Sequence, residues 1–186
     1  MQPGSSAAVD AALSPPTGLL QPIIKPFTRL QSGMYLHNRP EKDVHIHLID
    51  AYRLRLDDDY NFDGDAPSDS IYGGAPDSLQ GFQRFLALAG QRFGLLPPWW
   101  NAEKQSACEK MGIAPERWQW GNLRTKVTKK DIIDRYSDAR FPMQIRMLAE
   151  VVYQRGPGGA NGTHMLKTMV GTENGANALH TWLSLA

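Results

Sequence analysis

This 186-residue sequence contains very little cysteine and almost no excess charge. A single cysteine, Cys108, excludes an internal disulfide and a cysteine-rich zinc finger. Basic residues number 20 and acidic residues 19, which leaves a formal net charge of +1. No polybasic or polyacidic surface is therefore indicated, and nucleic acid is an unlikely partner on charge alone.

Long apolar runs are also missing. No stretch approaches the roughly 20 apolar residues that a membrane-spanning helix needs, so we expect no membrane partner. The first basic residue is Lys25, so neither a secretory signal nor an arginine-rich transit peptide is indicated. We therefore expect a cytoplasmic or nuclear protein. Its 41% apolar and 21% charged residues are ordinary for a soluble chain long enough to form one core.

Composition divides the chain into a leader and a body. Residues 1–22 are rich in alanine, proline, glycine and serine, which bury little surface, and we expect a disordered leader there. Residues 23–186 are predicted to form one helical domain. Its parts are an extended arm (23–40), a helical body (41–154), and a glycine-rich loop with a C-terminal segment (155–186).

The arm mixes apolar and polar residues around a turn at Ser32 and Gly33. This pattern predicts an extended segment or a small hairpin that pairs residues 27–30 with residues 34–36. No alternation typical of a strand is found outside the arm.

Apolar residues recur at helical spacing through the body. Val44, Leu48 and Tyr52 fall at steps of four and predict a helix over residues 41–56, ended by three aspartates that oppose the helix dipole. Further helices are expected over residues 79–93, 102–111, 128–136, 141–153 and 163–170. Ser78 is predicted to cap the first of these and Asn101 the second, and a capping box opens the third. The predicted fold class is mainly α, with about five to six helices in a single irregular domain and an extended N-terminal arm.

The stretch from Leu95 to Asn101 joins two of these helices. Pro97 and Pro98 forbid a helix and hold the chain extended, while Trp99 and Trp100 add a large apolar surface. Such a joint is expected to pack in the core or at an interface, because if it were exposed it would form an apolar patch that favours association with other molecules.

One partial motif suggests a metal. Asp59, Asn61 and Asp63 match the first half of a calcium-binding loop and follow a predicted helix. The second half fails, since Ser70 stands where a bidentate glutamate belongs. The segment fits an acidic, solvated loop better than a calcium site. We expect no bound metal and no other cofactor.

Several segments resemble a region of fungal MYND-type zinc-finger proteins. They are residues 25–30 (KPFTRL), 39–44 (RPEKDV), 48–53 (LIDAYR), 81–86 (GFQRFL), 94–104 (GLLPPWWNAEK) and 141–150 (FPMQIRMLAE). The resemblance covers about residues 22–170. In that family this region accompanies a MYND finger, and this chain, with one cysteine, carries no finger. The resemblance implies a fungal, intracellular protein with protein–protein contacts, and it implies no zinc and no catalytic residues.

Two functions compete at this point. The first is a non-enzymatic protein-interaction domain, adaptor or regulatory, of a MYND-like protein that lacks the finger; it has no recognisable catalytic set. The second is a small enzyme or ligand-binding accessory protein of fungal specialised metabolism, with a pocket near Trp99 and Trp100. The polar groups that could serve either site are Tyr72, Asp50, Arg53 and His47. A concave pocket with shifted pKa values would favour the second function, and a flat apolar patch the first.

Overall fold

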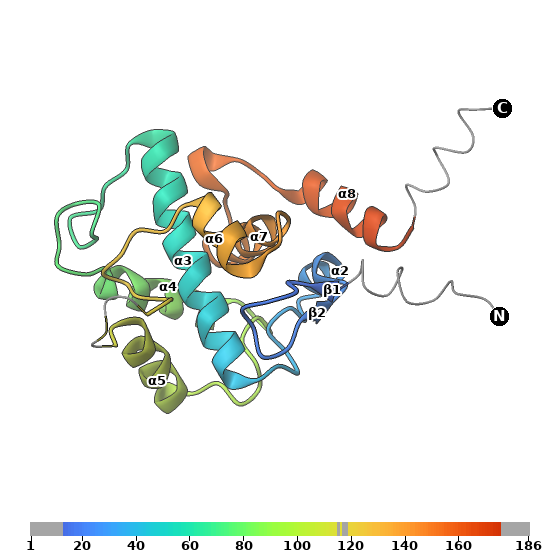
Figure 1. Ribbon diagram of the computed structural model, residues 1–186, viewed down its shortest axis with the longest axis horizontal. Coiled ribbons are helices and arrows are strands. Elements are labelled where there is room, and N and C mark those ends of the chain that lie inside the picture. The colour runs from blue at the N-terminus through green and yellow to red at the C-terminus, as the bar shows by residue number, and fades with distance from the viewer. Residues whose placement is uncertain (1–12, 115, 117–118, 176–186) are drawn as a thin grey trace.

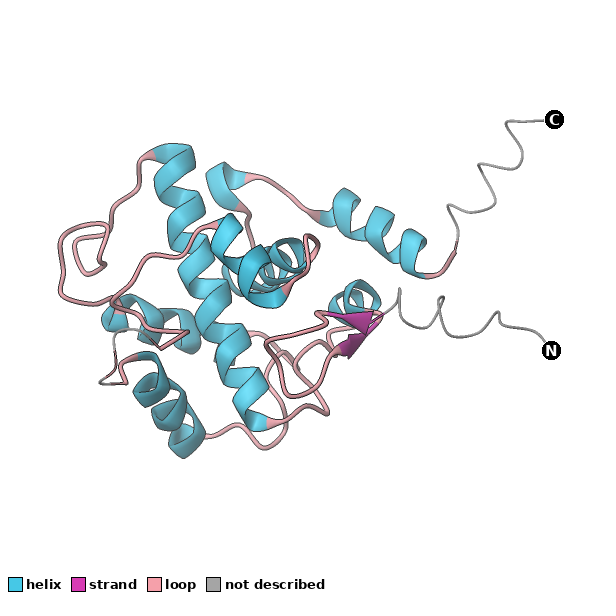
Figure 2. Cartoon of the chain, viewed as in Figure 1, coloured by secondary structure: helices cyan, strands magenta, loops and turns pink. Residues whose placement is uncertain are grey.

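A computed structural model describes residues 13–114, 116 and 119–175. Helices make up most of this part of the chain, with one short two-stranded sheet (Figures 1 and 2). The mainly helical class predicted from the sequence is therefore confirmed. The predicted turn around Trp118 and the apolar tail after residue 175 lie wholly or partly outside the described residues.

Helix α3 (Glu41–Asp63) forms the centre of the molecule, with the other helices around it (Figure 1). Every residue from Asp43 to Leu56 is buried except Ile46. The sequence predicted one apolar stripe, whereas the whole circumference of this stretch is covered. Its charged residues are buried together with their partners, as burying a charge requires. Asp43 pairs with Arg39 at 3.3 Å.

Helix α3 continues seven residues beyond its predicted end at Leu56. The three aspartates do not stop it, because each carboxylate accepts a hydrogen bond from a side chain in the folded structure. Asp57 accepts the Tyr72 hydroxyl, Asp58 accepts two hydrogen bonds from Arg146, and Asp59 accepts two from Arg55. These contacts outweigh the unfavourable helix dipole, which contributes about 0.3–1 kcal/mol per charge.

Four helices cover α3. They are α4 (Leu79–Gln91), α5 (Ala102–Gly112), α6 (Lys129–Tyr136) and α7 (Phe141–Tyr153). All four occur where the sequence predicted them, and α3, α4 and α7 contact one another. Two of the three predicted caps are confirmed, and the third is wrong. Asn101 caps α5 and a capping box opens α6, but α4 begins with the Asp77 carboxylate accepting the Leu79 N–H, and Ser78 instead accepts from Ile71.

The arm differs from its prediction. Strand β2 (Ile23–Ile24) pairs antiparallel with β1 (Leu13–Ser14), and residues 27–30 lie in helix α2 (Pro26–Gln31). The predicted hairpin of residues 27–30 with 34–36 is therefore wrong. Proline at the first position of α2 supplies a dihedral angle that suits a helix start, and this local signal prevailed over the apolar–polar alternation.

Part of the expected leader is packed against the body. Ser14 is buried, donates to the carboxylate of Asp138 and accepts from the side-chain amide of Gln144 at 2.6 Å. The expectation that residues 1–22 would form a disordered leader is thus wrong for residues 13–22, and residues 1–12 lie outside the described residues. Short polar residues bury readily when partners from distant elements satisfy their hydrogen bonds.

Helix α8 (Thr163–Glu173) follows a short 3-10 helix, η1 (Pro157–Gly159), and returns to the arm, where it contacts α2 (Figure 1). No residue of α8 is buried. The helix is fixed at its C-terminal end, where the Glu173 carboxylate accepts the backbone N–H groups of Phe27 and Thr28 at 2.9 and 2.8 Å.

The proline–tryptophan joint is packed, though less deeply than expected. Trp99 and Trp100 are partly buried, and the edge of Trp100 meets the His45 ring of α3 at 5.8 Å between centroids. Phe93, expected to face the core, is fully exposed. Helix α4 ends at Gln91, before the apolar periodicity could place Phe93 inward.

Candidate functional site

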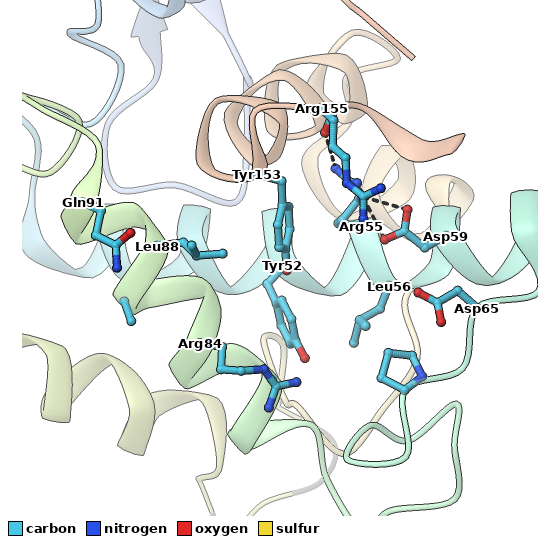
Figure 3. Close-up of a pocket in the computed structure, with 13 residues that line it drawn as sticks. Tyr52, Arg55, Leu56, Asp59, Asp65, Arg84, Leu88, Gln91, Tyr153 and Arg155 are labelled. Carbon is cyan, nitrogen blue, oxygen red and sulfur yellow. Dashed lines mark hydrogen bonds and ion pairs between the residues drawn. The ribbon is translucent and has the colours of Figure 1, made fainter. Parts of the chain in front are cut away.

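A cleft of about 430 Å³ lies between α3, α4 and the C-terminal end of α7, and we call it the α3–α4–α7 cleft (Figure 3). Its lining residues are Tyr52, Arg55, Leu56, Asp59, Asp65, Pro67, Gly81, Arg84, Ala87, Leu88, Gln91, Tyr153 and Arg155. The volume falls within the range of about 300–1,000 Å³ typical of ligand pockets. A second hollow, of about 810 Å³, is lined by Trp120, Lys42 and Arg135. Its wall reaches both sides of the loop at 115–118, which is not fully described, so we build the candidate site on the first cleft.

Tyr52 forms the floor of the α3–α4–α7 cleft. It is only 2% exposed, and its ring packs against Phe82 and Phe85 of α4 at 5.4 and 5.6 Å between centroids. The hydroxyl points toward Arg84 (Figure 3), and no described residue forms a hydrogen bond with it. Because the hydroxyl has no protein partner in the described part of the chain and lies at the cleft, it is available to bond a ligand there.

Gly81 makes the space that the hydroxyl itself occupies. A Cβ atom built on Gly81 would collide with the Tyr52 oxygen and would lie 3.6 Å from Nη2 of Arg84. The hydroxyl and the guanidinium therefore converge on the same spot, at a glycine in the first turn of α4. Arg84 is 62% exposed and pairs through Nη1 with Asp69, which leaves Nη2 free to donate toward the cleft.

A second phenol extends the floor. Tyr153, at the end of α7, packs on Phe85, and the Arg55 guanidinium lies over its ring at 4.7 Å. Burial raises the pKa of Tyr153 to about 12, and burial likewise raises the pKa of Tyr52 far above its ordinary value. Both phenols therefore remain neutral hydrogen-bond donors at physiological pH, and neither can act as a general base.

The wall opposite Arg84 is fixed by Arg55. Its Nε donates to both carboxylate oxygens of Asp59 at 2.7 and 2.8 Å, and Nη1 donates to the Arg155 carbonyl at 2.8 Å (Figure 3). Burial raises the pKa of Asp59, and its hydrogen bonds to Arg55 oppose that shift. With both oxygens occupied by one arginine, Asp59 is a structural partner and is poorly placed to take a proton from a substrate.

The residues predicted as site candidates are spread over the molecule. Asp50 and Arg53 do come together, 3.2 Å apart, but beneath the surface. Asp50 is fully buried and accepts the Tyr136 hydroxyl at 2.5 Å and the Trp120 indole N–H at 2.8 Å. Burial raises the pKa of Asp50, and the Arg53 charge opposes the increase. This network ties α3 to the chain around α6 and does not form an accessible site.

His47 is also buried, between the rings of Tyr35 and Phe141. Its Nδ1 donates to the Asp43 carbonyl at 2.5 Å, and its Nε2 has no hydrogen-bond partner. Burial, assisted by the Arg39 charge, lowers the pKa of His47 to about 3. The imidazole is therefore neutral and closed off from ligands.

Tyr72, Trp99 and Trp100 lie apart from the Asp50–Arg53 pair and from His47. Tyr72 donates to Asp57 at 2.7 Å and has the Lys126 ammonium over its ring at 4.5 Å. Neither Trp99 nor Trp100 lines the α3–α4–α7 cleft or the hollow at Trp120. No hydrogen bond, ion pair or ring contact among the described residues joins Tyr72 to either tryptophan or to His47.

The three calcium candidates lie on α3 and not in the loop that was predicted for them. On a helix, Asp59 and Asn61 point about 200° apart, so the set Asp59, Asn61 and Asp63 cannot converge on one ion. Asp59 is also occupied by Arg55. Among the described residues, no group of three or more histidine, cysteine, aspartate or glutamate side chains could hold a metal ion.

Sequence reasoning missed the α3–α4–α7 cleft, whose key residues are Tyr52, Gly81, Arg84 and Tyr153. One signal was available. Gly81 lies in the first turn of an apolar helix, and a glycine within a helix can indicate a close approach by another group. Nothing in the sequence alone showed that the approaching group is the Tyr52 hydroxyl.

Comparisons with models of protein families, with curated proteins and with solved structures each found no match. The resemblance to fungal MYND-type proteins therefore stays a prediction that rests on the quoted segments. Within the described part of the chain, no helix is both long enough and apolar enough to span a membrane.

Proposed function

We propose that this chain is a non-enzymatic protein-interaction domain, adaptor or regulatory, that binds its partner through the α3–α4–α7 cleft. The observation that carries the proposal is the unpartnered Tyr52 hydroxyl at the floor of a concave, partly apolar cleft. Leu56, Leu88 and Pro67 supply apolar surface, and Arg84 and Arg155 supply donors around it. A few convergent polar groups on an apolar lining are typical of a recognition site.

The chemistry of the lining supports binding over catalysis. The cleft is lined by no serine, cysteine, histidine or lysine. Its two phenols have raised pKa values, and Asp59 is held by Arg55. These groups can donate hydrogen bonds and attract charge, but they do not form a nucleophile with an adjacent base. The alternative, an enzyme or accessory protein with its pocket near Trp99 and Trp100, has less support, because neither residue lines a cleft described above.

The proposal also includes the family and location inferred from the sequence. The domain would be the companion region of a fungal MYND-like protein, acting without the finger, in the cytoplasm or nucleus. The quoted segments support the family, and the near-neutral charge supports a protein partner over a nucleic acid.

Selection of random heptapeptides displayed on phage, with the full chain as bait, tests the proposal. Ala87 is exposed on α4 and lines the cleft, so Ala87→Trp should fill it without disturbing the core. Gln80→Trp, exposed on the same helix but outside the cleft, is the matched control. The wild type and the control should enrich the same peptides, and Ala87→Trp should reduce their recovery at least tenfold. Equal recovery on Ala87→Trp, or no enrichment on the wild type, would contradict the proposal.

A further inference from the structure

Two donors that come from different helices converge on one spot of the α3–α4–α7 cleft. The Tyr52 hydroxyl reaches it from α3 and Arg84 reaches it from α4, both over the bare backbone of Gly81. Tyr52 is 2% exposed as a residue, and its hydroxyl has no hydrogen-bond partner among the described residues although the residue lines the cleft. Two donors placed together in this way can share one acceptor of a ligand.

The acceptor that fits best carries a negative charge. A guanidinium bonds a carboxylate more strongly than a neutral oxygen, and a neutral phenol adds a second donor. Three arginines and two aspartates line the cleft, and Asp69 just outside it pairs with Arg84. This near balance of charge suits one carboxylate better than a phosphate dianion, which would face Asp65 and Asp69 with too little compensation.

The surface beside this spot is apolar. Leu88 and Ala87 follow Gly81 along α4, and Leu56 lies one turn beyond Tyr52 on α3. A ligand that places a carboxylate beside the Tyr52 hydroxyl and Arg84 would therefore rest its neighbouring groups against aliphatic side chains.

We propose that the α3–α4–α7 cleft recognises an aspartate or glutamate side chain flanked by large apolar residues in a segment of a partner protein. This inference rests on the proposed function, and it adds the chemical identity of the segment. The Tyr52 hydroxyl, which lies against Gly81, and Nη2 of Arg84 hold the carboxylate at the cleft floor, and the aliphatic wall holds the flanking residues. Asp69 competes with the ligand for Arg84, so it tunes the affinity.

Four blocked tripeptides test this directly: acetyl-Leu-Glu-Leu-amide and its analogues with glutamine, lysine or leucine in the middle. Each is titrated into the ¹⁵N-labelled full chain, and affinities are taken from the amide resonances of residues that line the cleft. The glutamate peptide should bind at least fivefold more tightly than the glutamine peptide. Raising the salt concentration should weaken the glutamate peptide only, because exposed charge pairs are screened.

Two variants connect the preference to named groups. Asp69→Asn frees Arg84 from its competitor and should tighten binding of the glutamate peptide at least threefold, whereas Asp134→Asn, which breaks an exposed pair with Lys130 on α6, should not. Tyr52→Phe removes only the hydroxyl and should weaken the glutamate peptide at least threefold, whereas Tyr60→Phe, on an exposed tyrosine outside the cleft, should not.

The outcomes separate the two proposals. If all four peptides shift the cleft resonances with equal affinity, or if Asp69→Asn has no effect, the acidic preference is wrong while the cleft remains a binding site. If no peptide shifts those resonances even at 10 mM, the cleft is not a peptide-binding site, and the proposed function falls with the inference.

Discussion

Gly81 decides whether the α3–α4–α7 cleft stays open, and its role can be measured. Alanine in place of a glycine inside a helix normally stabilises a protein by about 1 kcal/mol. Here the added methyl group would collide with the Tyr52 hydroxyl. We therefore expect Gly81→Ala to destabilise the chain by about 1–3 kcal/mol in urea unfolding, which is the usual cost of overpacking.

Removal of the hydroxyl should relieve the collision. Tyr52→Phe keeps the ring on Phe82 and Phe85 and deletes a buried hydroxyl that has no protein partner, so alone it should be neutral or slightly stabilising. In that background the added Cβ would meet the ring at 3.2 Å, and most of the cost of Gly81→Ala should disappear. Additive effects of the two changes would show that the hydroxyl does not occupy this space.

His47 makes folding stability depend on pH. The folded chain holds this imidazole neutral with a pKa of about 3, whereas in the unfolded chain it titrates near 6.5. Between these values the unfolded state binds a proton that the folded state does not. The contribution of His47 is therefore fully present above pH 6.5 and is lost as the pH falls, by up to about 1.4 kcal/mol per pH unit.

A variant isolates this effect from other titrating groups. Asparagine at position 47 could still donate to the Asp43 carbonyl but cannot titrate. The difference in unfolding free energy between the wild type and His47→Asn should shrink, or change sign, as the pH falls from 6.5 to 4.5. A difference that stays constant over this range would mean that His47 is protonated in the folded chain.

At the scale of elements, α8 depends on one carboxylate. Glu173 accepts the N–H groups of Phe27 and Thr28 and the Thr28 hydroxyl, so it caps α2 from a distant part of the sequence. No residue of α8 is fully buried, and besides these hydrogen bonds the helix packs on the core through the partly buried Leu166, Met169 and Val170. Glu173→Ala should cost about 1–2 kcal/mol, the usual value of a helix cap.

Hydrogen exchange can locate that loss. Glu173→Ala should speed amide exchange in both α2 and α8, while Lys167→Ala, an exposed change on the same helix, should leave it unaltered. If exchange in α2 stays slow in Glu173→Ala, other contacts hold the two helices together.

At the scale of the whole molecule, the N-terminal strand ties the arm to the body. Ser14 bonds to Asp138 and Gln144, and the backbone N–H groups of Leu20 and Gln21 donate to the Asp43 carboxylate at 2.8 and 3.0 Å. A chain that begins at residue 21 loses the Ser14 contacts and leaves the buried Nε2 of Gln144 without its acceptor, although the Tyr35 hydroxyl still donates to Oε1 of Gln144. Relative to a chain that begins at residue 13, we expect a loss of about 2–3 kcal/mol and a Tm lower by roughly 4–12 °C. Equal Tm values for the two chains would show that residues 13–20 add nothing to stability.

The sequence by itself determined the helices of the body. The periodicity around α3, α4 and α7, the cap at Asn101 and the capping box at Thr128 are local signals, because they depend on residues within one or two turns of each other. The helical spacing of apolar residues, with no strand alternation outside the arm, also placed the chain in the mainly helical class. The proline–tryptophan joint was predicted to pack, although not that Trp100 would meet His45 of α3.

Only the tertiary structure decided the rest, because it depends on partners far apart in the chain. Helix α3 continues through three aspartates because the side chains of Arg55, Arg146 and Tyr72 donate hydrogen bonds to their carboxylates. The α3–α4–α7 cleft could not be predicted for the same reason, because it depends on a glycine of α4 that faces a tyrosine of α3. A local pattern can show that a helix contains a glycine. The reason that a larger residue is disfavoured there is steric, because a hydroxyl from another helix occupies the space.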